Sequence, residues 1–205
     1  VGRLTMLRGR LRAASAGILL AAAGIGLAVA MAWLLPLPDR LGYPGSVSVR
    51  DSGGETLHVF LAPDGRWRIP VELSEVDPAY VDALLRFEDK RFYDHFGVDL
   101  LAILRAVKVN LSQGGVVSGA STITMQLVRL VEARPRTLRS KAVEAFRAMQ
   151  LEVRMSKSEI LQAYLRFASF GRNIEGVEAG ALSCFGHRAD HLSKPEIATL
   201  LAIPQ

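Results

Sequence analysis

The chain has 205 residues, half of them hydrophobic, and carries a formal net charge of +5. Its single cysteine, Cys184, excludes an intrachain disulfide and a cysteine zinc site. The length suffices for one domain and an anchor, and the hydrophobic content directs attention to a membrane segment.

Residues 13–35 form an apolar segment without a charged side chain. A spanning helix needs about 20 apolar residues, whereas the apolar core of a signal peptide has about 7–15. The segment therefore predicts a single transmembrane helix rather than a cleaved signal peptide. Four arginines in residues 1–12 predict a cytoplasmic N-terminal tail, with everything after residue 35 on the far side of the membrane.

Positions 129–154 hold seven basic residues against three acidic ones. Next to a membrane anchor, this excess of positive charge indicates anionic lipid head groups or a phosphate-bearing substrate as partners. Nucleic acid is a poor fit for a domain that faces away from the cytoplasm.

Residues 36–71 are predicted to form a linker with a short β hairpin. Segments 46–50 and 56–61 read as strands on either side of the turn residues Ser52-Gly53-Gly54. Residues 67–71 predict a third strand.

The pattern becomes helical in residues 72–205, which are expected to form one domain. Asp77 before Pro78 predicts a helix start with Asp77 as the N-cap. Capping-box signatures at 156–159 and 193–196 predict two further helices. The glycines within 114–119 predict a flexible loop between two helices.

Glu88 shares one helical face with Val81, Leu84 and Leu85, at the spacing i, i+3, i+4 and i+7. A carboxylate on a buried stripe costs free energy unless something uses it, so Glu88 is a candidate general base or acid. Spacing alone favours another interpretation, a glutamate at a helix end that turns toward solvent.

Five segments, taken in order, resemble the motifs of glycosyltransferase family 51. That family comprises the glycan-polymerising domains of class A penicillin-binding proteins and the monofunctional transglycosylases. The first segment is Glu88-Asp-x-x-Phe92-x-x-His95-x-Gly97, and the others are 119–126 (Gly-Ala-Ser-Thr-Ile-Thr-Met-Gln), 141–144 (Lys-Ala-Val-Glu), 156–176 and 192–202. The match covers about residues 80–205, and the segments at 117–119 and 136–138 look most like the 1C type of class A protein.

The resemblance implies a mainly α, lysozyme-like bilobal domain behind the N-terminal transmembrane helix and the hairpin. It implies inverting transfer on lipid II, with release of undecaprenyl pyrophosphate. Glu88 is then the catalytic base for the acceptor 4-hydroxyl, and Glu144 is the second acidic residue, near the donor pyrophosphate. Matching the motifs assigns substrate binding to Asp89, Phe92, His95, Ser121, Thr122, Gln126, Arg129 and Lys141.

The physical needs of this reaction fit the assigned residues. Arg129 and Lys141 can neutralise the charge that develops on the leaving pyrophosphate. Ser121 is expected to be the N-cap of a helix, with the amides of Thr122 and Ile123 facing an anion. No protein metal site is predicted, but a divalent cation, Mg²⁺ or Mn²⁺, is left open beside Glu144.

The expected partners are lipid II, the growing lipid-linked glycan strand, the membrane and other cell-wall synthesis proteins. The expected location is the bacterial cytoplasmic (inner) membrane, with the catalytic domain on its periplasmic or extracytoplasmic side.

The chain departs from the family pattern at three places. Ser140 replaces the arginine that precedes the lysine of the third motif, and Arg166 replaces an asparagine in the fourth. The chain ends at Gln205, which predicts a C-terminally truncated domain, and it has no Ser-x-x-Lys motif in a suitable context, which predicts no transpeptidase. An inactive membrane-bound binding module, and less favoured a lysozyme-like glycan hydrolase, are the alternatives.

Overall fold

The structure, a computed structural model, describes residues 17, 23, 24, 26, 27, 29–54, 56–115 and 119–204. The chain divides into two units, Val1–Pro36 and Leu37–Gln205, and the second unit contains all the helices and strands discussed below.

Much of the predicted transmembrane segment, residues 13–35, falls outside the described residues. Within the part of the chain that the structure describes, no helix has both the length and the apolar character needed to cross a bilayer.

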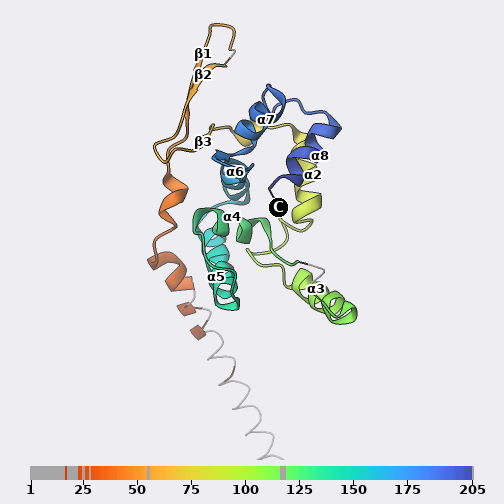
Figure 1. Cartoon of the computed structure of the whole chain (residues 1–205). Helices are drawn as coiled ribbons and strands as arrows, with labels where there is room; N and C mark the ends of the chain where they lie inside the picture. The colour runs from red at the N-terminus through yellow and green to blue at the C-terminus, as the bar shows by residue number, and fades with distance from the viewer. Residues whose placement is uncertain are drawn as a thin grey trace, which may run out of the picture. The chain divides into compact units, whose positions relative to one another are not determined.

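Two small sheets contain all the strands of the described ranges. Strands β1 (Val47–Arg50) and β2 (Thr56–Phe60) pair in antiparallel fashion and form the predicted hairpin, which projects from the helices of its unit (Figure 1). Strand β3 (Trp67–Arg68) is shorter than the predicted third strand and pairs in parallel with β4 (Ile174–Glu175). The third strand therefore joins the linker to the helical region instead of extending the hairpin.

Helices make up most of Leu37–Gln205, which confirms a mainly α fold; the bilobal, lysozyme-like arrangement stays a prediction. A short 3-10 helix, η1 (Asp39–Gly42), lies in the linker, and a second, η2 (Leu73–Glu75), precedes the α-helices. The α-helices are α2 (Pro78–Glu88), α3 (Leu100–Gln113), α4 (Ile123–Val131), α5 (Leu138–Arg154), α6 (Lys157–Phe167), α7 (Val177–Phe185) and α8 (Lys194–Ala202).

The three helix starts predicted from capping signatures are confirmed. The carboxylate of Asp77 accepts a hydrogen bond from the Ala79 amide at the start of α2, over 2.8 Å. Ser156 and Ser193 both form complete capping boxes, with Glu159 at the start of α6 and Glu196 at the start of α8. These signals are local in sequence, which is why they can be recognised without the fold.

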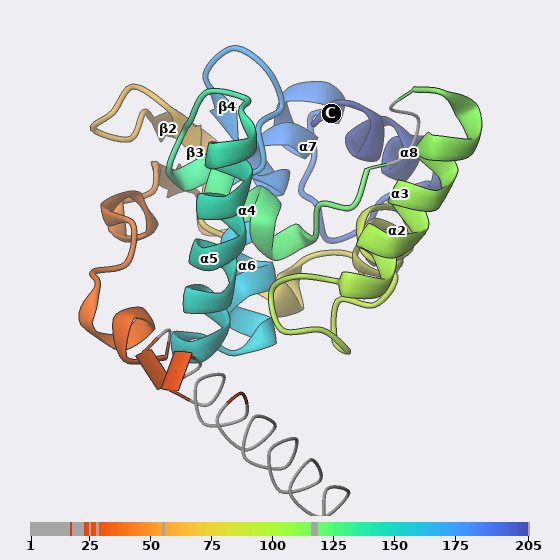
Figure 2. The ribbon, with the colours of Figure 1, turned by 90° about the horizontal axis from the view of Figure 1, so that it is seen from below.

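Helix α4 lies at the centre of the core. It packs against α5 and α6 on one side, and Figure 2 shows it between those helices and α2 and α3. Six of its nine residues are buried. Gln126 and Arg129, spaced i and i+3, are half-buried and therefore lie on the less covered face of the helix. The burial of α4 thus fixes the position of both polar side chains.

A buried ion-pair network attaches the linker to strand β4. Arg68 is fully buried; its Nη2 lies 2.6 Å from Glu175 Oε2 and 2.7 Å from Asp64 Oδ2. Arg40 Nη2 lies 2.5 Å from the other oxygen of Glu175. A buried guanidinium is tolerated only when it is paired and hydrogen-bonded, and both conditions hold here.

Arg166 belongs to the same junction. Its Nη2 donates a hydrogen bond to the Tyr43 carbonyl in the linker, and its guanidinium lies 5.3 Å from the centre of the Phe167 ring. Arg166 therefore provides a contact between α6 and the linker.

Candidate active site

A cleft of about 540 Å³ lies between the end of α2, the start of α3 and the loop that precedes α4. Glu88 and Ser121, from the first and second motifs, both line it. Lys90 and Arg105 also line the cleft, and the sequence patterns gave no reason to select them. The cleft is open to solvent and carries both acidic and basic side chains, as a site for a polar substrate requires.

Glu88 is the last residue of α2 and is half-buried. Its Oε2 accepts a hydrogen bond from Gln126 Nε2 over 2.7 Å. Glu88 does lie at the end of its helix, as the alternative interpretation assumed. Its carboxylate is nevertheless held against α4 and does not turn toward solvent. The interpretation as a functional carboxylate is therefore favoured over that of a solvated helix end.

Two buried tyrosines lie close enough to Glu88 to be affected by its charge. Burial first, and then the negative charge of Glu88, raise the pKa of the Tyr80 hydroxyl and of the Tyr164 hydroxyl. Both phenols therefore stay protonated at neutral pH. Tyr164 uses its hydrogen to donate to Gln126 Oε1 over 3.2 Å.

Ser121, Arg129, Lys141 and Glu144 form a second cluster. Glu144 Oε2 lies 3.4 Å from Arg129 Nη2 and 3.7 Å from Lys141 Nζ. Lys141 Nζ also donates to Ser121 Oγ, and Arg129 Nη2 lies 3.5 Å from the same oxygen. Three elements, the loop before α4, α4 itself and α5, thus bring these side chains together.

The positively charged side chains of this cluster are more exposed than its carboxylate. The Glu144 side chain is only 7% exposed, whereas those of Arg129 and Lys141 are 38% and 44% exposed. Burial lowers the pKa of the Lys141 amine, the charge of Glu144 opposes that change, and the charge of Arg129 adds to it. A buried carboxylate beneath two exposed cations leaves a positive surface suited to an anion such as a phosphate.

The same arrangement bears on the divalent cation that was left open beside Glu144. Two protein cations already lie within 3.7 Å of Glu144 Oε2. Within the described ranges, no group of three or more His, Cys, Asp or Glu side chains is placed to hold a metal ion. Because Mg²⁺ is commonly bound by only one or two carboxylates together with substrate phosphates, a divalent cation between Glu144 and the pyrophosphate stays a prediction.

The prediction that Ser121 caps α4 is wrong. The N-cap is Thr122, whose Oγ1 accepts from the Met125 amide over 3.1 Å and donates to the Gly97 carbonyl over 2.6 Å. The hydroxyl of Ser121 is instead engaged by Lys141. The amide of Ile123 does face an anion, but that anion is the Asp89 carboxylate, 2.9 Å away.

Asp89, Phe92 and His95 lie in the packing around the cleft. Both carboxylate oxygens of Asp89 are within 3.0 Å of His95 Nε2, and both side chains are almost fully buried. Lys157 Nζ lies 4.5 Å from the centre of the Phe92 ring, which is itself buried, and donates to the His95 carbonyl. This placement favours a role in holding the first motif against α4 and α6; their contact with substrate stays a prediction.

Gly97 completes this packing. It has a φ of 78°, and a Cβ added there would lie 2.8 Å from the carbonyl carbon of Ala148 in α5. Glycine is required by both its left-handed backbone and this close approach.

Ser140 cannot supply the positive charge of the arginine that it replaces. It is buried in the first turn of α5, and its Oγ lies 2.9 Å from Oγ1 of Thr137, the N-cap. Arg139 is exposed and, among the described residues, forms no hydrogen bond or ion pair with the cluster around Glu144.

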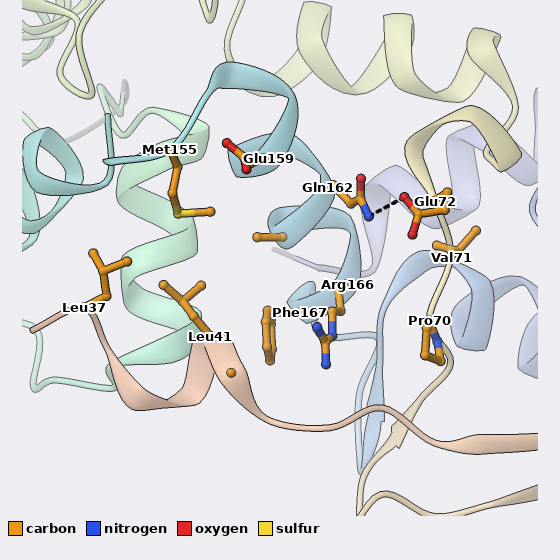
Figure 3. Close-up of a pocket in the computed structure, with 12 residues that line it drawn as sticks. Leu37, Leu41, Pro70, Val71, Glu72, Met155, Glu159, Gln162, Arg166 and Phe167 are labelled. Atoms are coloured by element: carbon orange, nitrogen blue, oxygen red, sulfur yellow. Dashed lines mark hydrogen bonds between the residues drawn. The ribbon is translucent and has the colours of Figure 1, made fainter. Parts of the chain in front are cut away.

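A second cavity, of about 510 Å³, lies between the linker and α6 (Figure 3). Leu37, Leu41, Met155 and Phe167 provide apolar walls, and Gln162 Nε2 donates to Glu72 Oε2 over 2.8 Å beside them. None of the residues assigned to catalysis or substrate binding lines this cavity. The candidate active site is therefore the cleft beside Glu88.

Comparison with known proteins agrees with the motifs. The family model described as Transglycosylase matches residues 53–205. Penicillin-binding protein 1C of Escherichia coli K12 is 41% identical over 172 residues, which cover 84% of this chain and 22% of that protein. Penicillin-binding protein 1A of Haemophilus influenzae Rd is 42% identical over 139 residues, which cover 67% of this chain and 16% of that protein. Penicillin-binding protein 1A of Aquifex aeolicus is 39% identical over 139 residues, covering 67% and 19%.

The chain spans about a fifth of the length of these curated relatives. The family match covers most of the chain, and it includes the cleft beside Glu88 and the cluster around Glu144. The chain therefore belongs to the transglycosylase family, the glycosyltransferase domain family of class A penicillin-binding proteins, as its motifs predicted.

Proposed function

We propose that this chain is a peptidoglycan glycosyltransferase that acts in bacterial cell wall synthesis. In this proposal it polymerises lipid II into glycan strands by inverting transfer and releases undecaprenyl pyrophosphate. The observation that carries the proposal is the Glu88 carboxylate, held by Gln126 in the same cleft that Ser121 lines.

Glu88 has the geometry of a general base. Gln126 occupies Oε2, and among the described residues no hydrogen bond involves Oε1, which is left for the substrate. A sugar hydroxyl is a poor nucleophile, so removal of its proton during attack lowers the barrier. In the proposed step, Oε1 takes the proton of the acceptor 4-hydroxyl while that oxygen bonds to the anomeric carbon of the donor. The bond from the anomeric carbon to the pyrophosphate oxygen breaks on the opposite side.

The cluster around Glu144 suits the leaving group. Negative charge develops on the pyrophosphate as it departs, and preorganised cations at that position stabilise the transition state. Arg129 and Lys141 are held in place by Glu144 but remain exposed. Because Ser121 accepts from Lys141, its own hydroxyl hydrogen is available to a phosphate oxygen.

A membrane location is part of the same proposal. Helix α3 presents Leu100, Leu104, Val107 and Leu111 along one face, each between 49% and 79% exposed. An amphipathic helix with an uncovered apolar face is suited to the interface of a bilayer. A lipid-linked substrate would reach the cleft from there, since Arg105 of α3 lines it.

The test is polymerisation of lipid II by the purified protein in detergent. We expect Glu88→Gln to abolish polymer formation while leaving the folded protein intact. Asp82→Asn is the matched control, because Asp82 is an exposed carboxylate of the same helix whose one ionic partner among the described residues is Arg86. Full activity of the Glu88→Gln variant would disprove the assignment.

The family pattern has an arginine at the position of the buried Ser140, so the cluster has one cation fewer than that pattern. This difference favours the non-catalytic alternative. The lipid II assay and a second assay on finished glycan decide among the three functions. Binding of lipid II without polymerisation in the unmodified protein would establish a binding module, and release of soluble fragments from finished glycan would establish a hydrolase.

A further inference from the structure

We infer that Tyr164 is a positioning residue for the catalytic base: it holds Glu88 through Gln126 without touching substrate. The inference rests on the proposed function, since it concerns the same carboxylate. Tyr164 is not among the residues that the motifs assign to catalysis or substrate binding.

Three helices contribute one side chain each to this arrangement. Tyr164 in α6 donates its hydroxyl hydrogen to Gln126 Oε1 over 3.2 Å. Gln126 in α4 donates from Nε2 to Glu88 Oε2 over 2.7 Å, at the end of α2. Tyr164 is 3% exposed and Gln126 is half-buried, so water competes poorly for the first of these bonds.

The orientation of the Gln126 amide is what Tyr164 controls. A glutamine side chain can present either its oxygen or its NH₂ group to a neighbour, and a carboxylate can only accept. The NH₂ group must therefore face Glu88. Tyr164 stays a phenol, because burial and the charge of Glu88 both raise the pKa of its hydroxyl. Its hydrogen thus matches the amide oxygen and favours that one orientation.

Loss of the phenol hydrogen would leave the amide oxygen buried without its donor. Rotation of the amide would then expose that oxygen to solvent or turn it toward Glu88, where two acceptors repel each other. In either case the carboxylate loses its fixed position relative to the acceptor hydroxyl. Catalysis by a general base depends on that geometry, so the effect should appear in turnover more than in substrate binding.

The experiment compares two tyrosines in the lipid II polymerisation assay. We expect Tyr164→Phe to lower kcat about tenfold, with KM changed by less than about twofold and an unchanged unfolding temperature. Tyr80→Phe is the matched control. Tyr80 is equally buried and also responds to the charge of Glu88, but among the described residues its hydroxyl makes no hydrogen bond to Gln126. Its kcat should stay within about twofold of the original protein.

A double-mutant cycle tests the route through Gln126. Gln126→Met removes the amide, so adding Tyr164→Phe to it should lower kcat no further. An independent tenfold loss in the Gln126→Met background would overturn the inference, and so would an unchanged kcat for Tyr164→Phe alone. These results leave the proposed function intact as long as Glu88→Gln is inactive. An inactive unmodified protein, or an active Glu88→Gln variant, overturns the proposed function and the inference with it.

Discussion

Gln126 Nε2 lies 2.7 Å from Glu88 Oε2, so a residue of the second motif holds the carboxylate of the first. Gln126 sits on the most buried helix of the domain, which is fixed by α5 and α6. Glu88, at the end of its own helix, has no such support from α2 alone. The position of the proposed base is therefore set by the core through this one hydrogen bond.

Gln126→Glu should lower kcat at neutral pH at least about tenfold, because it brings a second carboxylate to hydrogen-bond distance of Glu88, where two like charges disfavour each other. Gln162→Glu is the matched control, since Gln162 Nε2 donates to Glu72 Oε2 over 2.8 Å outside the cleft. Polymerisation rates of the two variants are the measurement. Equal losses would show that the effect is one of general stability.

Lys141→Met should lower kcat/KM for lipid II about 100-fold, because it removes a cation that faces the departing pyrophosphate. Among the described residues, it also leaves the buried Glu144 with Arg129 as its one cationic contact. Arg139→Met, in the same helix but exposed, should change kcat/KM by less than about twofold. A comparable loss in Arg139→Met would mean that Arg139 stands in for the arginine that Ser140 replaces.

Asp89→Asn should destabilise the fold by about 2–4 kcal/mol, because it disrupts the buried contacts to His95 Nε2 and the Ile123 amide. Asp94→Asn, an exposed change in the same loop, should leave the free energy of unfolding nearly unchanged. Denaturant unfolding measures both. If Asp89→Asn instead keeps its stability and raises KM for lipid II, Asp89 contacts substrate as the motif match predicted.

Local signals in the sequence were sufficient for helix starts, because capping boxes at Ser156 and Ser193 need only residues three positions apart. The roles of Arg129, Lys141 and Glu144 were expected only from the resemblance to the family, and the structure shows that these side chains are in contact. Contacts between distant residues gave no comparable signal. Tyr164 and Gln126 are 38 positions apart, and Arg68 and Glu175 are 107 apart, so neither pair has a spacing that a helix or strand period would reveal.

The wrong N-cap prediction for α4 also results from contacts between residues that are distant in sequence. Ser121 and Thr122 are adjacent, and either hydroxyl suits an N-cap. Tertiary contacts determine which of the two is the N-cap, because Thr122 also donates to the Gly97 carbonyl and Ser121 accepts from Lys141. Neither partner is a neighbour in sequence.

Acid should weaken the start of α8 through Glu196. Hydrogen bonds from the Ser193 amide first, and from His187 next, lower the pKa of Glu196 from 4.5 to about 2. A carboxyl with a lowered pKa in the folded state contributes stability above its unfolded pKa and loses it as pH falls through the folded value. The unfolding temperature of the original protein should therefore exceed that of Glu196→Gln above about pH 4.5, and the difference should vanish near pH 2.

His187→Gln separates the two sources of this effect. Since the Ser193 amide is the larger cause and His187 the smaller, most of the acid-dependent difference should persist when Glu196→Gln is made in a His187→Gln background. The pH dependence that His187 contributes has the opposite sign. The hydrogen bond to Glu196 raises the pKa of His187. The stability that His187 contributes is therefore complete below about pH 6.5 and is lost as pH rises through the raised pKa. Thermal unfolding from pH 2 to 8 checks both signs, and a difference that vanishes entirely with His187→Gln would show that the ion pair, not the capping box, stabilises this helix start.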